Sequence, residues 1–489
     1  MLFNSLDFAI FFPIVFVLYW LVFNKLHLRN ILILVSSYIF YGWWDWRFLF
    51  LIVISSFVDF FVGNKLGKTE DIKKRKRLLY ISLLVNLGFL FYFKYTNFFI
   101  EAFVDSFTLF GKTLEISTLN IILPVGISFY TFQTLSYTID IYRGQLKPTK
   151  DPIAFFAFVA FFPQLVAGPI ERASHLLPQF YNTYKFNYNQ IKSGLLLIAF
   201  GLFKKMIIAD RAALYVNEVY NHPSNYEGIE TIIATILFAF QIYCDFSGYS
   251  DIAIGVARTM GFDLMKNFDS PYLSKSITEF WRRWHISLST WFRDYVYIPL
   301  GGSRQGKYKT YFNLFIVFLV SGLWHGAAMT FVIWGAIHGV IIVIEKATYE
   351  FKKPVYSKLG LLKNNVSNKS FFVFITFIIV CFAWVFFRAN SFVDSQIIVN
   401  SFFTNNFNEI LGDKLYLIGL RENEFSLLVI AIIVLVFIER FHKKRNLFNF
   451  LNQQSLAFRW SIYVFITLCI TVFGVYGENN VSDFIYFQF

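Results

Sequence analysis

Charged residues are scarce in this sequence. Asp, Glu, Lys and Arg make up 15% of its 489 residues, whereas hydrophobic residues make up 56%. A soluble globular domain carries about a quarter charged residues. This composition excludes an ordinary soluble protein and favours a chain that lies mostly in lipid.

Cysteine pairs and several enzyme motifs are also absent. Cys244, Cys381 and Cys469 lie separately in apolar runs, which predicts neither a disulfide framework nor a metal site. There is no GxxxxGK[ST] phosphate loop, no HExxH and no GxSxG motif. The missing phosphate loop argues against an ATP-driven pump, and no metal cofactor is expected.

What the sequence contains instead is a series of continuous apolar runs. Many approach the roughly 20 residues that cross a bilayer, and they do not alternate as in a membrane β-barrel. The expected fold class is an all-α polytopic membrane protein with about eleven transmembrane helices, as a single domain over residues 1–489. No cleavage site follows the first run, so it is expected to stay as a span. The predicted spans are 8–23, 31–42, 47–63, 78–99, 119–137, 153–168, 191–209, 230–256, 311–346 (too long for one helix), 370–388, 425–441 and 459–475.

Basic residues cluster between the apolar runs and give a net charge of +13. This distribution is typical of the positive-inside rule and gives no reason to expect nucleic-acid binding. The loops Lys25–Arg29, Lys65–Arg77 and Arg440–Arg445 are predicted to face the cytoplasm. One span follows the last loop, so residues 476–489 are predicted to form an extracytoplasmic tail, which ends in FIYFQF. Taken alone, such a tail is typical of an interfacial anchor.

Residues 258–346 form the block that carries the candidate chemistry. Ser276 followed by Glu279 predicts a helix start, and the apolar spacing up to Tyr295 predicts one amphipathic helix at the membrane interface. His285 lies on its apolar side, where a structural and a catalytic role are both open. Six basic residues either face lipid phosphates or hold a phosphorylated donor. They are Arg282, Arg283, Arg293, Arg304, Lys307 and Lys309.

The apolar run 311–346 is interrupted by SGLWHGA, residues 321–327. Its glycines predict a break or a close helix approach, which places His325 deep in the bilayer beside protein or a water-filled cavity. Intramembrane ionisable residues are functional candidates, and neutral imidazole is a common general base. His325 is therefore the predicted base, with bracing of two helices as the alternative. His338 lies about 220° further around a helix and is predicted to point away.

Two further polar clusters lie in apolar surroundings. Asp245 and Asp251 fall within the predicted span 230–256, where a buried carboxylate needs a partner. They could order a histidine, bind the donor or pair with arginines, and pairing is favoured. In the second cluster, Glu171 and Arg172 form a candidate ion pair near a helix end.

Together these stretches make the chain resemble the membrane-bound O-acyltransferases. Within that family it is most similar to the bacterial alginate and peptidoglycan O-acetyltransferase membrane subunits, with teichoic-acid D-alanyl transferases as a sibling group. The matching segments are densest between residues 120 and 340. They are IILPVGISFYTFQTLSY, PQLVAGPIER, QIYCDFSGYSDIAIG, NFDSPYLSKSITEFWRRWHISLSTWFRDYVYIPLGG and SGLWHGA.

The resemblance implies a ring of tilted helices, with interfacial and re-entrant helices, around a central tunnel that holds a buried histidine. That histidine matches His325, and the second characteristic histidine of the family matches His285. The implied donor is acetyl-CoA from the cytoplasm, held by the arginines together with Trp324 and Asp245. The implied location is the bacterial cytoplasmic (inner) membrane.

The implied acceptor is an extracytoplasmic polysaccharide such as alginate or peptidoglycan. Related systems carry a similar aromatic tail, whose tyrosine would accept the acetyl group and pass it to a separate extracytoplasmic SGNH esterase-like partner. That tyrosine matches Tyr486. Direct glycan acylation, D-alanyl transfer to teichoic acid, a glycan flippase and a membrane scaffold are the alternatives.

Overall fold

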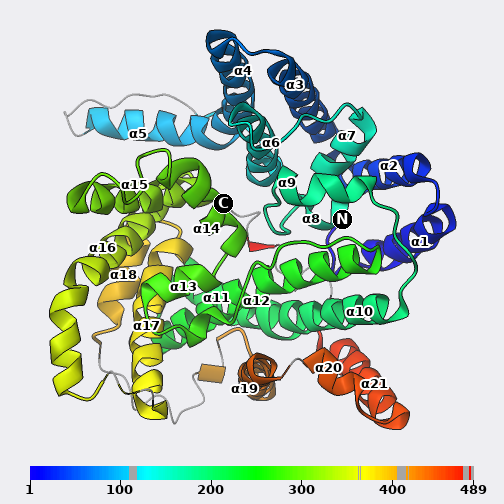
Figure 1. Ribbon diagram of the computed structural model, residues 1–489. Coiled ribbons are helices and arrows are strands. Elements are labelled where there is room, and N and C mark those ends of the chain that lie inside the picture. The colour runs from blue at the N-terminus through cyan, green and yellow to red at the C-terminus, as the bar shows by residue number, and fades with distance from the viewer. Residues whose placement is uncertain are drawn as a thin grey trace. The chain divides into compact units, whose positions relative to one another are not determined.

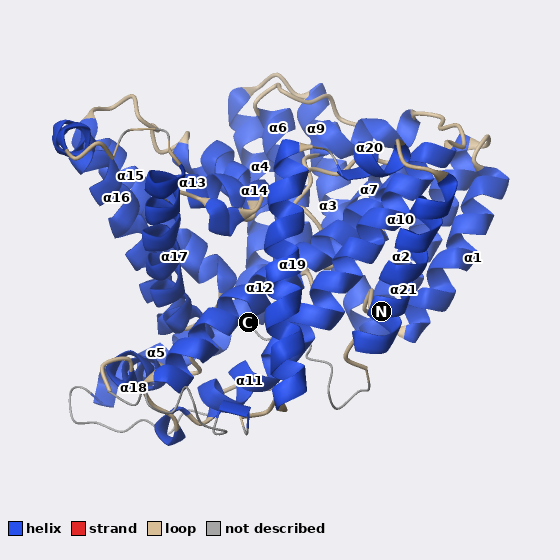
Figure 2. Cartoon of the chain, turned by 90° about the horizontal axis from the view of Figure 1, so that it is seen from below, coloured by secondary structure: helices blue, strands red, loops and turns tan. Residues whose placement is uncertain are grey.

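The fold is described by a computed structural model over residues 1–108, 118–361, 363, 365–404, 415–416, 418–445, 447–476 and 484–485, without the side chains of residues 105 and 108. Every regular element in these ranges is a helix (Figure 1, Figure 2). The chain divides into two compact units, residues 1–198 with 252–265 and residues 199–251 with 266–489. An all-helical fold was predicted from the continuous apolar runs, and these ranges bear it out.

The first unit is built from helices of the N-terminal part. They are α1 (Leu6–Val22), α2 (Leu26–Asp45), α3 (Leu49–Lys68), α4 (Ile72–Leu90), α5 (Thr96–Thr108), α6 (Ile127–Tyr142), α7 (Pro152–Ala160), α8 (Phe162–Leu165), α9 (Ala173–Leu176) and α10 (Tyr188–Leu202), which runs on into the second unit.

Two spans predicted in this unit are not single helices. The prediction 119–137 is wrong in its first half, because α6 begins only after Gly126, whose φ of 73° is left-handed. The prediction 153–168 is divided into α7 and α8 at Phe161. Pro163 explains this break, since it cannot donate the helical hydrogen bond to the carbonyl four residues earlier.

The second unit contains the remaining helices and the block predicted to carry the chemistry. The helices are α11 (Asp210–Asn221), α12 (Ile229–Thr259, whose last residues belong to the first unit), α13 (Ile277–Arg283), α14 (Ile286–Phe292), α15 (Lys307–His325), α16 (Met329–Lys358), α17 (Val366–Arg388), α18 (Phe392–Ser401), α19 (Glu422–Lys444), α20 (Leu447–Asn452) and α21 (Leu456–Phe473). The overlong run 311–346 is thus two helices, α15 and α16, with the break where SGLWHGA predicts it.

Seven helical stretches of the described chain are long and apolar enough to cross a membrane, which indicates a multi-pass membrane protein. They are Leu26–Lys68, Ile72–Val104, Ile229–Thr259, Met329–Lys358, Val366–Arg388, Glu422–Lys444 and Leu456–Phe473. The count of about eleven spans stays a prediction.

Two basic segments predicted as loops are instead helical. Lys73–Arg77 lies in the first turns of α4, because Asp71 caps that helix by accepting the N–H of Lys73 at 2.9 Å. Arg440–Lys444 forms the last turns of α19. Cations at the end of α19 interact favourably with the helix dipole.

The start of the second unit packs closely on α12. A Cβ on Gly248 would lie 2.8 Å from the carbonyl oxygen of Gly201, so only glycine fits there. The close approach places η4, a π-helical segment over Phe203–Ala209, against α12 and turns Lys204 and Lys205 toward its carboxylates. Such π-helical turns are rare and frequently lie at functional sites.

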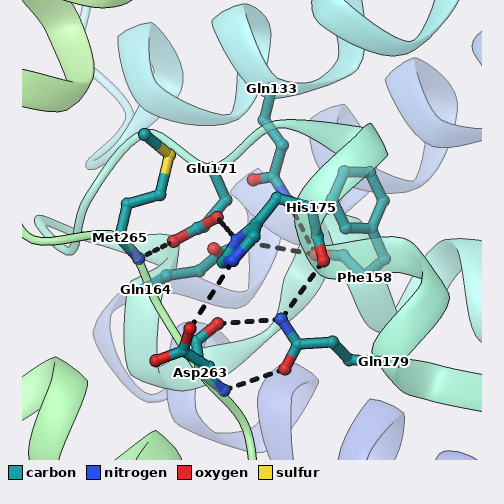
Figure 3. A network of polar contacts seen from close by, with 8 residues as sticks. All are labelled: Gln133, Phe158, Gln164, Glu171, His175, Gln179, Asp263 and Met265. Carbon is teal, nitrogen blue, oxygen red and sulfur yellow. Dashed lines mark hydrogen bonds and ion pairs between the residues drawn. The ribbon is translucent and has the colours of Figure 1, made fainter. Parts of the chain in front are cut away.

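A polar network fastens the loop after α8 within the first unit (Figure 3). The buried carboxylate of Glu171 accepts the N–H of Met265 at 2.5 Å and binds Nδ1 of His175 at 2.8 Å. Nε2 of His175 lies 3.7 Å from the carboxylate of Asp263. Glu171, which was predicted to pair with Arg172, therefore pairs with His175, four residues later.

The α15–α16 hairpin holds His325 at its bend through facing glycines. A Cβ on Gly322 would lie 2.3 Å from the carbonyl oxygen of Phe331, and one on Gly335 would lie 2.4 Å from that of Phe318. Small residues let membrane helices approach each other closely. The two backbones therefore meet one turn before His325.

Replacing Gly322 by alanine is expected to destabilise the protein, because the new methyl group would overlap the Phe331 carbonyl. Overpacking costs about 1–3 kcal/mol, more than the ~1 kcal/mol that alanine gains over glycine in a helix. Gly88→Ala in α4 is the matched control, since its methyl group would meet no described atom within 4 Å. The apparent midpoint of thermal unfolding in detergent should fall only for Gly322→Ala, and equal midpoints would contradict this packing.

The Glu171–His175 pair should make stability depend on pH. The hydrogen bond with Glu171 raises the pKa of His175, and burial raises the pKa of Glu171. A raised histidine pKa stabilises the fold fully below its unfolded value of about 6.5, and the effect is lost as pH rises through the folded value. Between about pH 6 and pH 9 the unfolding midpoint of the parent protein should fall more than that of His175→Gln. Parallel curves for the two proteins would refute this linkage.

Candidate active site

The amphipathic helix predicted over the central block is two helices that meet at His285. α13 begins as predicted, with Ser276 Oγ accepting the N–H of Glu279 at 3.0 Å. His285 then has a φ of 44° and a ψ of 55°, which ends α13 before α14 starts. Left-handed backbone is strained for a residue other than glycine, and such strain clusters at functional sites. The prediction of one continuous helix is wrong.

Asn267, in the loop after α12, holds this break in place. Its side-chain oxygen faces Nδ1 of His285 at 3.1 Å and accepts the hydroxyl of Ser287 at 2.9 Å, and its backbone oxygen accepts the N–H of Ile286 at 2.9 Å. An amide oxygen only accepts, so Nδ1 carries the proton and Nε2 is the basic nitrogen. Burial lowers the pKa of His285 to about 3, which keeps the ring neutral near pH 7.

His325 lies at the end of α15 and is almost fully buried, as predicted for a histidine at the SGLWHGA break. Its ring centroid lies 5.0 Å from those of Trp324 and Trp334, 5.5 Å from that of Phe387 and 6.3 Å from that of His285. The structure thus brings both predicted catalytic histidines together. Their catalytic role stays a prediction.

Trp324 contacts the histidine pair directly, whereas His338 contacts it through Trp334. The Trp324 ring contacts both histidines of the pair, with its centroid 6.0 Å from that of His285. His338 accepts the indole N–H of Trp281 at 3.2 Å. The Trp334 ring centroid lies 5.0 Å from that of His325 and 5.1 Å from that of His338. His338 therefore belongs to the packing behind the pair.

Asp245, predicted to bind the donor or to pair with an arginine, pairs with a lysine. Its Oδ1 lies 2.8 Å from Nζ of Lys205, which lies 2.8 Å from Asp210. The neighbouring Lys204 binds Asp251 at 2.7 Å. The expectation of an arginine partner is wrong. A lysine doublet inside the predicted span 191–209 was the sequence signal for these partners, since buried carboxylates need cations.

Residues Phe484 and Ile485 are buried against the same part of the second unit. The N–H of Ile485 donates to Oδ2 of Asp245 at 2.8 Å. The Phe484 ring lies 4.8 Å from Tyr249 and 5.9 Å from Phe246, and Phe246 in turn lies 4.7 Å from the His285 ring. Phe484 of the predicted tail thus contacts Phe246, the ring that packs against His285. Tyr486 lies outside the described residues.

The predicted donor-binding cations stay near the surface while the histidines are buried. Arg283 pairs with Glu279 of its own helix, and Arg293 binds Asp294 at 2.7 Å. The other four are exposed, namely Arg282, Arg304, Lys307 and Lys309. Contact of this group with a donor stays a prediction.

Comparison with known proteins identifies the family. The sequence matches the membrane-bound O-acyltransferase family profile over residues 148–389. It is 38% identical over 503 aligned positions to the "Probable alginate O-acetylase AlgI" of Pseudomonas putida, covering 100% of both chains. It is 42% identical to the protein of the same name from Pseudomonas aeruginosa, covering 80% of this chain and 72% of the relative.

A relative that is named for a different substrate is nearly as similar. The chain is 37% identical over 385 positions to the "Peptidoglycan O-acetyltransferase" of Helicobacter pylori, covering 73% of this chain and 71% of the relative. The family profile spans α7 to α17, so it includes the Lys205–Asp245 pair and both buried histidines. This chain belongs to the membrane-bound O-acyltransferase family and is a multi-pass membrane O-acyltransferase.

Proposed function

We propose that this enzyme passes an acetyl group from cytoplasmic acetyl-CoA across the inner membrane for O-acetylation of an extracytoplasmic envelope polysaccharide. Alginate and peptidoglycan are the acceptor classes that the names of its relatives favour. The observation that carries the proposal is the buried pair His285 and His325, which Phe246 connects to Phe484 through ring contacts. A buried histidine pair that is one aromatic ring away from a peptide of the same chain suits a relay through that peptide.

In this proposal His325 is the general base and Tyr486 is the first acceptor. The phenolic oxygen attacks the carbonyl carbon of the thioester, so a C–O bond forms and the C–S bond breaks. The phenolic proton passes to His325 and then to the CoA thiolate, which leaves as the thiol. A phenol with a pKa of about 10 needs such a base near neutral pH.

His285 is proposed as the second catalytic histidine. Its hydrogen bond to Asn267 presents Nε2 as an acceptor, and its burial favours the neutral ring. A neutral imidazole can accept a proton from the reacting groups. Before that transfer the buried ring carries no charge. Such preorganisation costs no rearrangement during the reaction.

The outer half of the proposal requires residues 476–489 on the extracytoplasmic face. The acetyl group on Tyr486 would be an aryl ester, which has a good leaving group for the next transfer. A separate SGNH esterase-like protein would then move it to a sugar hydroxyl. On the inner side, the surface arginines and Trp324 are proposed to hold acetyl-CoA, since arginine binds phosphate in a bidentate manner.

The relay predicts that the C-terminal peptide becomes acetylated when the purified protein receives acetyl-CoA. Mass spectrometry should find acetyl on Tyr486 in the parent protein and none in Tyr486→Phe or His325→Ala. Loss of a general base should slow CoA release by about 10²–10⁴-fold. His175→Gln, in the other unit, is the control and should keep the parent rate.

Two results would contradict this mechanism. CoA release by His325→Ala at the parent rate would show that His325 is not the base. An unmodified Tyr486, with CoA released only when a polysaccharide is supplied, would indicate direct transfer to the glycan.

A further inference from the structure

From the end of α21 onward, the chain makes hydrogen bonds to the second unit in two places, first to η4 and α11 and then to α12. The N–H of Val475 donates to the carbonyl of Met206 at 3.0 Å, and Arg211 donates to the carbonyl of Phe473 at 2.9 Å. Further along, Ile485 binds Asp245, whose other oxygen binds Lys205. The chain thus leaves α21 beside η4, and further along it binds Asp245, the carboxylate that pairs with Lys205 of η4.

The buried cluster of Lys205, Asp210 and Asp245 is suited to bind a peptide backbone. Its two carboxylates outnumber its single ammonium group, and all three side chains are at least nine-tenths buried. Lys205 occupies Oδ1 of Asp245, which leaves Oδ2 oriented toward the N–H of Ile485. A hydrogen bond to a carboxylate is stronger than one between neutral groups.

A backbone N–H carries no side-chain information, so the selectivity of this contact comes from the apolar walls. Phe484 packs on Tyr249 and Phe246, and Ile485 is 1% exposed. Phe246 also contacts His285. Binding the N–H of Ile485 therefore fixes the register of the peptide, because Tyr486 is the next residue in the chain.

We propose that Lys205, Asp210 and Asp245 form a peptide anchor that sets the register of the C-terminal segment at the acyl-transfer site. Asp245 and Lys205 are then positioning residues for the acceptor peptide and do not bind the donor. The role of this anchor rests on the proposed function, because the register of the peptide affects acyl transfer only if Tyr486 accepts the acyl group.

The first test measures binding of the C-terminal peptide in the absence of acetyl-CoA. Hydrogen–deuterium exchange of the C-terminal peptide is followed in the full-length protein in detergent. Ile485→Pro removes the donated N–H without changing a residue of the buried cluster, although it also shortens the buried side chain and fixes φ. Ile485→Val keeps the N–H while shortening the same side chain and is the matched control. Parent and Ile485→Val should show at least about tenfold slower exchange of this peptide than Ile485→Pro and Asp245→Ala, since 1.4 kcal/mol corresponds to a factor of 10.

The second test separates anchoring from donor binding in the same proteins. Ile485→Pro and Asp245→Ala should acetylate Tyr486 at least about tenfold more slowly than the parent, with the KM for acetyl-CoA unchanged within about twofold. A raised KM for acetyl-CoA in Asp245→Ala, with a protected C-terminal peptide, would assign Asp245 to the donor and overturn the anchor.

The two proposals fail in distinguishable ways. A parent peptide that exchanges as fast as an unstructured peptide would overturn the anchor, whatever happens to the acetyl group. Slow exchange that depends on Asp245, in a protein that never acetylates Tyr486, would establish the anchor as a contact and refute its role in acyl transfer together with the relay.

Discussion

An ammonium group and a carboxylate that are buried in an apolar protein must find each other, because either one alone costs several kcal/mol to desolvate. In the second unit this requirement is met where η4 packs on α12, through Lys205 with Asp210 and Asp245. The glycine contact between Gly201 and Gly248 makes the approach close enough. Helix packing, charge burial and the hydrogen bond of Ile485 therefore meet where these two elements touch.

The histidine pair depends on hydrogen bonds to another loop. Asn267, in the loop after α12, accepts hydrogen bonds from the residues around His285. Asn267 supplies the acceptors that the interrupted helix at His285 lacks, so the left-handed turn is held by side-chain and backbone hydrogen bonds together. His325 is held from the other side by the glycine-lined bend of α15 and α16. The Trp324 ring contacts both imidazoles, and burial keeps both away from bulk water.

Sequence patterns predicted the features that depend on neighbouring residues. The helical class, the cap at Ser276 and the break after His325 all follow from local composition. The break at His285 does not, because it is held by Asn267, eighteen positions earlier in the chain. The partners of Asp245 and Glu171 were mispredicted for a similar reason: the sequence shows that a buried carboxylate needs a partner, but packing decides which one.

The attachment of both ends of the C-terminal segment to the same region has a kinetic consequence. Only residues 476–483 separate Val475, which is hydrogen-bonded to η4, from Phe484, which packs on Tyr249. A short tether holds its far end at an effective concentration in the millimolar range. An acceptor carried by this segment would meet the acyl donor as an intramolecular partner. Its rate of acylation would then be independent of protein concentration and insensitive to competing free phenols below the millimolar range.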